Sequence, residues 1–430
     1  MVDRARRVAI VDGCRTPFIK SGTLLKDFTS YELGKIATIE LLNRTELDVN
    51  EVDEVIFGTV VPSIKTSNVA REIAIDAGVP PHVPAFSVAR ACASANQAIT
   101  SAAEAILTGR CHTVIAGGTE SLSDPPILFS RRMREAFQQA AKAKSFGAKL
   151  RAFGHLRLRD LAPEAPAIAE RVTGLTMGQS AERMAKENGI SRKEQDEFAY
   201  RSHRNAAAAT DDGRLKQEIV PTFLPPDFTT AVTEDNGIRR DTTLEALAEL
   251  PPVFDRQYGS VTAGNASPLS DGASALLIMS QEKARALGYR PLGYIRSYAY
   301  AALSPWDQLL MGPAYAAPIA LDRAGLSLKD MDLIEMHEAF SAQVLSNIQA
   351  FQSRAFAREK LGREEPLGEV DLEKLNVCGG SIAIGHPFGA TGGRLTITIL
   401  NELKRRGGQF GLITVCAAGA LGFAMVVERE

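Results

Sequence analysis

The stretch AFSVARACASANQAITSAAEAILTG, residues 85–109, decides the fold class of this chain. Its first part has the alternating apolar residues of a buried strand, Phe86 and Val88. Its second part repeats apolar residues at helical spacing and stops at Gly109; these residues are Ile99, Ala103, Ile106 and Leu107. Cys92 stands at the junction among small residues. We therefore expect a buried strand that turns directly into a helix, with a thiol on the turn.

The position of Cys92 allows two interpretations. Most lone cysteines are inert and pack as small hydrophobic residues. At the start of a helix, however, free backbone N–H groups and the positive end of the helix dipole favour a thiolate. The same N–H groups can bind the oxyanion that forms when sulfur attacks a carbonyl carbon. Considered alone, the turn fits both a packing residue and a nucleophile.

The composition is that of an ordinary globular chain: 430 residues, 45% hydrophobic and 23% charged, with a formal net charge of −2. This length suits roughly two or three domains. The balanced charge argues against nucleic acid as a partner, and no apolar run reaches the roughly 20 residues of a membrane span. The first residues, MVDRARRVAIVDG, lead directly into a predicted strand, so we expect no signal or transit peptide.

Cysteine usage predicts the compartment. The chain has five cysteines and no CxxC pair; they are Cys14, Cys92, Cys111, Cys378 and Cys416. An odd number without such pairs predicts neither a disulfide framework nor a zinc site. We expect reduced thiols, a cytoplasmic location and no bound metal.

Two distant stretches resemble each other and predict an internal duplication. LDVNEVDEVIFG, residues 47–58, and LSLKDMDLIEMH, residues 326–337, each place an Asp before an apolar strand. A strand, a small-residue turn, a helix and another strand follow each of them, which favours two α/β halves around a shared helical layer. We predict an N-terminal half over residues 1–121, completed by residues 246–285, and a C-terminal half over residues 286–430.

Residues 122–245 are predicted to form an inserted subdomain on the surface. Its first part is strongly basic; the cations are Arg131, Arg132, Arg134, Lys142, Lys144, Lys149, Arg151, Arg157 and Arg159. A run of this kind is often only the solvated face of a helix. It can also be a docking surface for an anionic ligand, a partner subunit or a membrane, and the sequence leaves these alternatives open.

Four further motifs carry residues that could take part in chemistry. His386 lies in a Gly-rich turn (GHP) before a helix, which is a structural position or a way to present an imidazole to a ligand. Cys416 ends an apolar strand before a Gly/Ala loop. His337 follows a strand in HEAF, and because residue 341 is Ser this is not a HExxH metal motif. The small-residue stretch TAGNAS, residues 262–267, suits a tight path around a ligand.

Together and in this order, the Cys92 turn, TAGNAS, GHP and the second cysteine resemble the motifs of the thiolase family along essentially the whole chain. HEAF, where most thiolases have NEAF, and the insert LRLRDLAPEAPAIAERVTGLTMGQSAE, residues 156–182, are most similar to the β subunits of fatty-acid oxidation multienzyme complexes of the bacterial anaerobic type. The resemblance implies an α/β thiolase fold, in which two duplicated halves form a layered αβαβα core.

The resemblance also implies roles for individual residues. Cys92 would attack the 3-keto carbon of a 3-ketoacyl-CoA, and His386 would take the thiol proton. Cys416 would protonate the departing acetyl-CoA enolate, and free CoA would then accept the acyl group in a ping-pong reaction. His337 would replace the usual Asn that holds the water of an oxyanion hole.

A second oxyanion hole is implied at the backbone N–H groups of Cys92 and Ala418. Many thiolases have Gly at positions 418 and 420, so a positive φ would make Ala costly there. Met177 and Ser267 match positions that line the acyl and pantetheine channel. The family uses CoA as a co-substrate and holds no permanent cofactor.

The resemblance implies a homodimer or tetramer. It also implies a partner α subunit with hydratase and dehydrogenase activities. The basic insert is the expected contact surface for this subunit or for a membrane. A biosynthetic acetoacetyl-CoA thiolase is the main alternative, because the reaction is reversible and uses the same residues. The cysteine at position 416 argues against a decarboxylating ketoacyl synthase, and the presence of all three reactive residues argues against a catalytically inactive scaffold.

Overall fold

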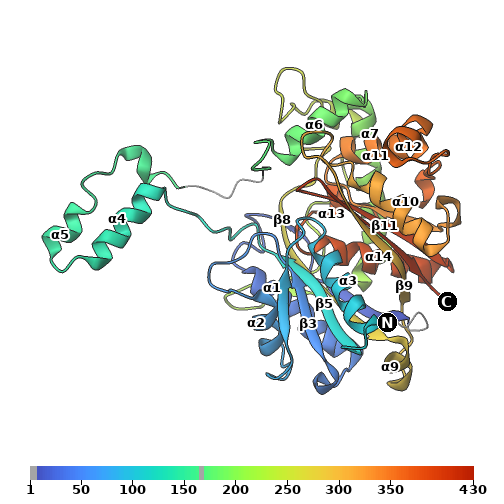
Figure 1. Cartoon of the computed structure of the whole chain (residues 1–430), viewed down its shortest axis with the longest axis horizontal. Helices are drawn as coiled ribbons and strands as arrows, with labels where there is room; N and C mark the ends of the chain where they lie inside the picture. The colour runs from blue at the N-terminus through green and yellow to red at the C-terminus, as the bar shows by residue number, and fades with distance from the viewer. Residues whose placement is uncertain (1–6, 164–168) are drawn as a thin grey trace.

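In the computed structural model, which describes residues 7–163 and 169–430, the body is built on a ten-stranded sheet (Figure 1). One half of the sheet consists of β4 (Ala85–Val88), β3 (Glu54–Gly58), β5 (Thr113–Glu120), β8 (Ser270–Ser280) and β1 (Val8–Arg15), in spatial order. The other half continues with β9 (Gly293–Ala302), β12 (Leu421–Glu428), β11 (Phe410–Ala417) and β10 (Leu333–Met336). The short strand β2 (Ile19–Lys20) pairs with β8. A brief antiparallel pairing of β1 with β9 joins the two halves.

Helices form three layers around these two half-sheets. The central layer is α3 (Ser94–Leu107) and α14 (Thr391–Arg406), which pack against each other and against strands of both halves. Helices α1 (Ser30–Thr45) and α2 (Val69–Asp76) cover the outer face of the N-terminal half, and α10 (Gly312–Ala324) and α11 (Ser341–Gln352) cover that of the C-terminal half. This arrangement confirms the predicted αβαβα layering of the thiolase fold.

The two halves share most of their elements in the same order, which confirms the duplication, but one expected element differs. Among the described residues the C-terminal half has no strand corresponding to β4, and the short helix α13 (Ser381–Ile384) precedes the GHP turn instead. In each half a 3₁₀ turn precedes a parallel strand, β3 or β10, and a central helix precedes the next strand, β5 or β11. The loop before α3 carries Cys92, and the loop before α14 carries His386. The two side chains therefore come from the loops that precede the two central helices, and they lie next to each other.

Local signals in the sequence account for the ends of the helices. Thr29 and Glu32 form a reciprocal capping box at the start of α1. Gly407 ends α14 with a φ of 71°, directly after three basic residues in its last turn. Helix α3 ends just before Gly109, which has a φ of 76°. A left-handed φ of this kind is accessible to glycine at little cost.

One expectation for the opening stretch is wrong. Strand β4 lies at the edge of the sheet, and it is only partly covered rather than buried. Phe86, predicted to be a core residue, is 37% exposed, and Val88 is only half-buried. Alternating apolar residues occur on any strand with one covered face, and the sequence does not reveal that β4 has a partner strand on one side only.

The region 122–245 consists of two structurally different parts. Helices α4 (Arg131–Lys142) and α5 (Phe146–Arg151) form a projecting lobe, which Figure 1 shows apart from the body. By contrast, α6 (Met177–Glu187) and α7 (Arg192–Asp211) pack on α11 of the C-terminal half. The domain limits drawn from the sequence stay a prediction. Residues 164–168 of the insert lie outside the described residues.

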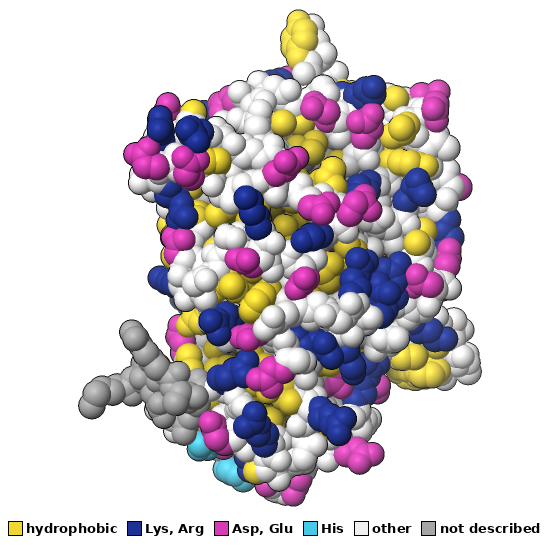
Figure 2. Space-filling view, turned by 90° about the vertical axis from the view of Figure 1, so that its right-hand side faces the viewer, with side chains coloured by type: hydrophobic (Ala, Val, Ile, Leu, Met, Phe, Trp, Pro, Cys, Tyr) yellow, Lys and Arg dark blue, Asp and Glu magenta, His cyan; other side chains and the backbone are white. Residues whose placement is uncertain are grey.

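The remaining elements are short. They are β6 (Thr222–Phe223), β7 (Ala231–Val232), α8 (Leu244–Ala248), α9 (Gln281–Ala286), α12 (Arg354–Leu361) and α13 (Ser381–Ile384). Within residues 7–163 and 169–430, no helix is both long enough and apolar enough to cross a bilayer. On the face seen in Figure 2, basic and acidic side chains are interspersed with small hydrophobic patches.

Candidate active site

A strained turn presents Cys92 between β4 and α3. Ala91, directly before it, has a φ of 44°, in the left-handed region that non-glycine residues rarely occupy. Ser94 stabilises this turn, because its Oγ accepts from the N–H of Arg90 at 2.8 Å and donates to the carbonyl of Ala91 at 2.7 Å. Strain that the surroundings maintain in this way is common at functional positions.

A glycine turn presents His386 to the same point. Gly385 has a φ of 113°, and the N–H of His386 donates to Ser270 Oγ at 3.1 Å. The ring Nδ1 lies 2.7 Å from Thr391 Oγ1, whose hydroxyl donates to the carbonyl of Pro387 at 3.0 Å. Since the hydroxyl proton of Thr391 is already used, His386 Nδ1 carries a proton and donates it.

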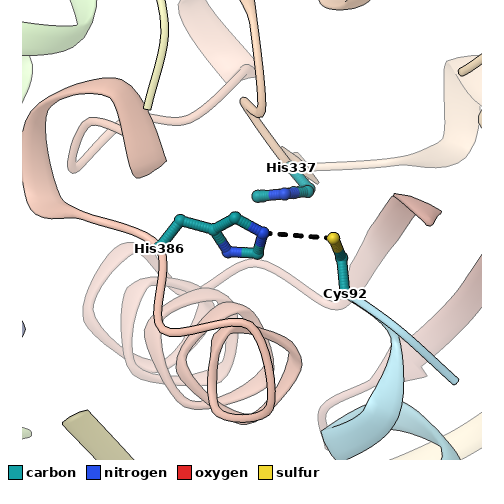
Figure 3. A group of neighbouring side chains, drawn as sticks. All are labelled: Cys92, His337 and His386. Atoms are coloured by element: carbon teal, nitrogen blue, oxygen red, sulfur yellow. Dashed lines mark hydrogen bonds between the residues drawn. The ribbon is translucent and has the colours of Figure 1, made fainter. Parts of the chain in front are cut away.

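Cys92 and His386 form a direct hydrogen bond. Cys92 Sγ lies 3.2 Å from His386 Nε2 (Figure 3), the nitrogen left with a free lone pair by the Nδ1–H tautomer. Burial raises the pKa of the Cys92 thiol to about 12. Burial, with a smaller effect from Arg394, lowers the pKa of His386 to about 3. The resting pair is thus a neutral thiol that donates to a neutral imidazole.

The start of the helix favours the thiolate, as expected, but it does not decide the protonation state of Cys92. Backbone hydrogen bonds from Ala418 and from Cys92 itself do lower the pKa of the thiol. Burial outweighs these hydrogen bonds. The free-energy cost of moving a thiolate out of water exceeds the stabilisation that the two backbone N–H groups provide. The same two N–H groups are those expected to form the second oxyanion hole, and both converge on the sulfur.

The two alanines of the 418–420 loop differ in their backbone conformation. Ala418 does not have a positive φ, so its N–H reaches Cys92 without backbone strain. Ala420 has a φ of 55° and carries the expected cost of a non-glycine residue in the left-handed region. Gly419 between them has a φ of 83°.

His337 lies beside this pair in the interior. It directly follows β10, and its backbone N–H donates to the carbonyl of Thr414 at 2.9 Å. Its ring is 4.1 Å from the ring of His386, between centroids, and its Nδ1 lies 3.1 Å from Ser381 Oγ. The side chain is fully buried, and its Nε2 has no hydrogen-bond partner among residues 7–163 and 169–430. Burial is the main cause that lowers the pKa of His337.

Cys416 is buried near the same group. It lies on β11 with 1% of its surface exposed. Burial raises the pKa of its thiol far above the ordinary value, and the neighbouring Cys92 adds to this effect. Cys14 and Cys378, for which the sequence indicates no chemical role, are buried as well. Cys92 alone among the five is partly exposed.

A cavity of about 360 Å³ opens onto Cys92 and His386. The three residues predicted to contact substrate, Met177, Ser267 and Ala418, all line it. The other lining residues are Val60, Val61, Pro62, Ala91, Pro126, Ala169, Leu269, Ala339, Phe340 and Phe388. Because these are nearly all apolar, the cavity suits a hydrocarbon chain next to a reacting carbonyl group.

The TAGNAS stretch follows the wall of this cavity as a tightly bonded loop. Ala266 of this stretch forms an isolated bridge to Phe340 of HEAF, and Leu269, two residues beyond the stretch, forms one to His386 of the GHP turn. The Asn265 side chain accepts from the N–H of Thr262 at 2.8 Å and donates to Asp196 at 2.9 Å. This bonding holds the loop in one path around the cavity.

Glu120 belongs to the site and was missed by sequence reasoning. It ends β5, is fully buried, and accepts from the N–H groups of Val60, Val61 and Gly389 and from the hydroxyl of Thr59. It therefore ties the cavity wall at residues 60–61 to the GHP turn. Burial raises the pKa of Glu120 to about 7, against the hydrogen bonds that lower it. The sequence signal that could have revealed Glu120 is a carboxylate at the end of an apolar strand.

Comparisons with known proteins agree with this geometry. Residues 8–282 match the family model described as Thiolase, N-terminal domain, and residues 289–429 match Thiolase, C-terminal domain. The chain belongs to the thiolase family and is accordingly an acyltransferase. A "3-ketoacyl-CoA thiolase" of Yersinia enterocolitica is 51% identical over 424 residues, which cover 99% of this chain and 97% of that one.

Solved structures are similar as well. Human mitochondrial 3-ketoacyl-CoA thiolase superposes with a TM-score of 0.83 and 33% identity, covering 99% of both chains, and a second structure of it contains CoA. The acetyl-CoA acetyltransferase of Bacillus anthracis superposes with a TM-score of 0.84 and 34% identity, covering 98% of both chains.

Proposed function

We propose that this protein is a 3-ketoacyl-CoA thiolase, which cleaves a 3-ketoacyl-CoA with free CoA to acetyl-CoA and an acyl-CoA two carbons shorter. The observation that carries this proposal is the Cys92–His386 hydrogen bond at the mouth of an apolar cavity. The relatives named 3-ketoacyl-CoA thiolase support the same substrate class. The reaction suits fatty-acid β-oxidation.

In the first half-reaction, Cys92 Sγ attacks the 3-keto carbon while its proton passes to His386 Nε2. The proton must move during the attack, because the Cys92 thiol and the His386 imidazole are both neutral before it. The N–H groups of Cys92 and Ala418 stabilise the oxyanion that forms on the 3-keto oxygen. The C2–C3 bond then breaks, and the acyl group stays on the sulfur as a thioester.

The departing fragment is the enolate of acetyl-CoA, and it needs both a proton and charge stabilisation. Cys416, the second thiol of the site, supplies the proton to the C2 carbon. The imidazole of His386 lines the cavity, and the ring of His337 lies directly behind it; we assign both to donating to the enolate oxygen or to a water bound there. His337 Nε2, which has no partner among the described residues, is the atom available for this contact.

The second half-reaction reverses the proton transfers with a fresh CoA. The Cys416 thiolate takes the proton of the CoA thiol, and the resulting sulfur attacks the acyl–Cys92 thioester. His386 then returns its proton to the released sulfur of Cys92. Splitting the transfer into two steps through a covalent intermediate predicts ping-pong kinetics. CoA acts as a co-substrate, and Met177 and Ser267 at the cavity wall are the proposed contacts for its pantetheine arm and the acyl chain.

We propose that two copies of the chain associate through β4. This strand lies at the end of the sheet, and its outer edge has no partner strand among the described residues. Phe86 on it is 37% exposed, which is unusual for an aromatic residue on an otherwise well-formed strand. A second copy would cover this edge, as exposed strand edges generally require.

We also propose that the projecting lobe docks a partner. It exposes large apolar side chains between its cations; Phe146 is 76% exposed and Leu158 is 87% exposed. Within the lobe, Phe137 makes a tilted ring contact with Phe129 and an edge-to-face contact with Phe153. Apolar and basic side chains together suit an α subunit with hydratase and dehydrogenase activities, or an anionic membrane surface.

A cytoplasmic location remains our proposal for the compartment. It is supported by the five free thiols, all within the described residues, of which two are proposed to react. Free thiols persist in a reducing compartment and are oxidised elsewhere.

The test of the main proposal is thiolysis of 3-ketoacyl-CoA esters of increasing chain length with free CoA, in the wild-type protein and in Cys92→Ser. Loss of substrate in the wild-type protein alone supports the reaction and its nucleophile. The apolar cavity predicts activity on esters longer than acetoacetyl-CoA. Activity confined to acetoacetyl-CoA would support an acetyl-CoA C-acetyltransferase instead, and no turnover at any length would overturn the proposal.

A further inference from the structure

Cys92, His337 and His386 form a cluster of metal-ligand type, in addition to their places in the acyl-transfer reaction. One atom of each, the sulfur and one nitrogen of each ring, lies within 4.8 Å of the others. A thiolate and two imidazoles are ligands that Zn²⁺ and related ions prefer. Ligands on one tetrahedral zinc ion lie roughly 3.5 Å apart, so small rotations of these side chains would complete such a set.

A second, independent observation points to a ligand. His337 is fully buried, yet its Nε2 has no hydrogen-bond partner in the part of the chain that the structure describes. Buried polar atoms are normally paired, and an unpaired one calls for an explanation. The other nitrogen of the ring is already held by Ser381, so Nε2 is the atom free to bind an ion.

The surroundings of both rings match those of metal-binding histidines. Such histidines usually have the second ring nitrogen held by an oxygen, which fixes the tautomer and the ring orientation. Here Thr391 Oγ1 holds Nδ1 of His386 at 2.7 Å, and Ser381 Oγ holds Nδ1 of His337 at 3.1 Å. The nearby cation, Arg394, is paired with the buried Glu335 at 2.9 Å, which offsets its repulsion of an incoming ion.

We propose that Cys92, His337 and His386 together bind one divalent ion of the zinc type, and that this complex reversibly inhibits acyl transfer. Binding forms one metal–sulfur and two metal–nitrogen bonds. The Cys92 thiol proton leaves to the buffer, and nothing is oxidised or reduced. The cavity in front of Cys92 gives the ion a path of entry and leaves the fourth position to water.

Inhibition follows from the atoms that the ion occupies. The sulfur lone pair that would attack the 3-keto carbon is bound to the metal, and His386 Nε2 can no longer take a proton. The ion therefore competes with the acyl substrate. A chelator such as EDTA restores activity, since no covalent bond within the protein has changed.

Binding is tested directly with the full-length protein, free of substrate. Zn²⁺ is titrated by calorimetry, and Co²⁺ is titrated by absorption, where a thiolate ligand produces a sulfur-to-cobalt charge-transfer band. The variants are Cys92→Ser and His337→Asn, with Cys416→Ser as the matched control, because Cys416 is a thiol of the same site outside the cluster. Circular dichroism and thermal unfolding confirm that each variant is folded.

The expected result is one ion per chain in the wild-type protein and in Cys416→Ser. Loss of the charge-transfer band is expected in Cys92→Ser. In Cys92→Ser and His337→Asn we expect the affinity for the ion to weaken at least about tenfold. Loss of a residue that only supports a metal ligand can already have an effect of this size. Undiminished binding in His337→Asn, loss of binding in Cys416→Ser, or no saturable binding in the wild-type protein would overturn the proposal.

Discussion

The sulfur of Cys92 lies 3.2 Å from Nε2 of His386, although 294 positions separate the two residues in the chain. Their loops occupy equivalent places in the two halves of a duplicated fold, each before one of the two central helices. The duplication therefore provided two similar loops, and different residues in them became the nucleophile and its base. Replacement of either residue should remove the same reaction step.

The first prediction concerns this pair. His386→Asn removes the proton acceptor and should lower kcat about 10²- to 10⁴-fold, the usual contribution of a positioned general base. Combining it with Cys92→Ser should lower kcat little beyond the larger single effect, because the two residues act as a unit. His112→Asn, an exposed histidine, is the control and should retain full activity. Multiplicative losses in the double variant would contradict the shared step.

The second prediction concerns pH. Because burial raises the pKa of Cys92 to about 12, the reactive thiolate fraction should increase about tenfold per pH unit across the neutral range. Alkylation of Cys92 by iodoacetamide, measured by mass spectrometry of the labelled peptide, should therefore accelerate from about pH 6 to pH 9 without reaching a plateau. Cys92→Ser reports the background from other thiols. A plateau below about pH 8 would mean that the thiol ionises far more readily.

The third prediction concerns Glu120, which accepts two hydrogen bonds at each carboxylate oxygen. Glu120→Gln keeps the shape but turns one acceptor into a donor, so buried N–H groups lose their partner. We expect a loss of about 1–3 kcal/mol in the free energy of unfolding. A fall in kcat should accompany it, since the GHP turn is no longer held.

Measuring kcat at low temperature, where the Glu120→Gln variant is folded, distinguishes a positioning role of Glu120 from a purely structural one. Where the variant is fully folded, its kcat should still be reduced. Glu197→Gln, on the surface of α7, serves as the control and should change neither stability nor kcat. Normal kcat in folded Glu120→Gln would limit Glu120 to stability.

The fourth prediction concerns the lobe. Replacing residues 131–159 with a short Gly/Ser linker should leave the thermal unfolding of the body unchanged, because α4 and α5 pack mainly on each other and project from the body (Figure 1). Co-purification with a purified α subunit, or sedimentation with anionic vesicles, should be lost. Which of the two is lost identifies the partner. Retention of both would show that the lobe does not dock either one.

Much of the fold follows from local patterns. The capped helix ends, the strand that enters the Cys92 turn and the repeat of Asp before an apolar strand all depend on residues close together in the chain. Local conformational preferences act over a few residues, so a short stretch of sequence reports them directly. The motifs around Cys92, His386, His337 and Cys416 were identified in the same way, and the resemblance to thiolases assigned them to one site.

Burial was harder to predict. Phe86 and Val88 alternate like core residues, and yet among the described residues β4 has a neighbouring strand on one side only. The region 122–245 was treated as one insert, but α6 and α7 pack on the C-terminal half, whereas α4 and α5 project from the body. In both cases the outcome depends on which distant elements pack against a segment, and the segment itself does not encode that.

By itself, the sequence determined the alternation of strands and helices, the duplication, the thiol on a turn and the imidazole in a glycine turn. Only the tertiary structure decided the protonation states of Cys92 and His386, the unpaired Nε2 of His337 and the part played by Glu120. The physical reason is that a pKa or an unpaired atom reflects every group that surrounds it. In this site those groups come from both halves of the chain.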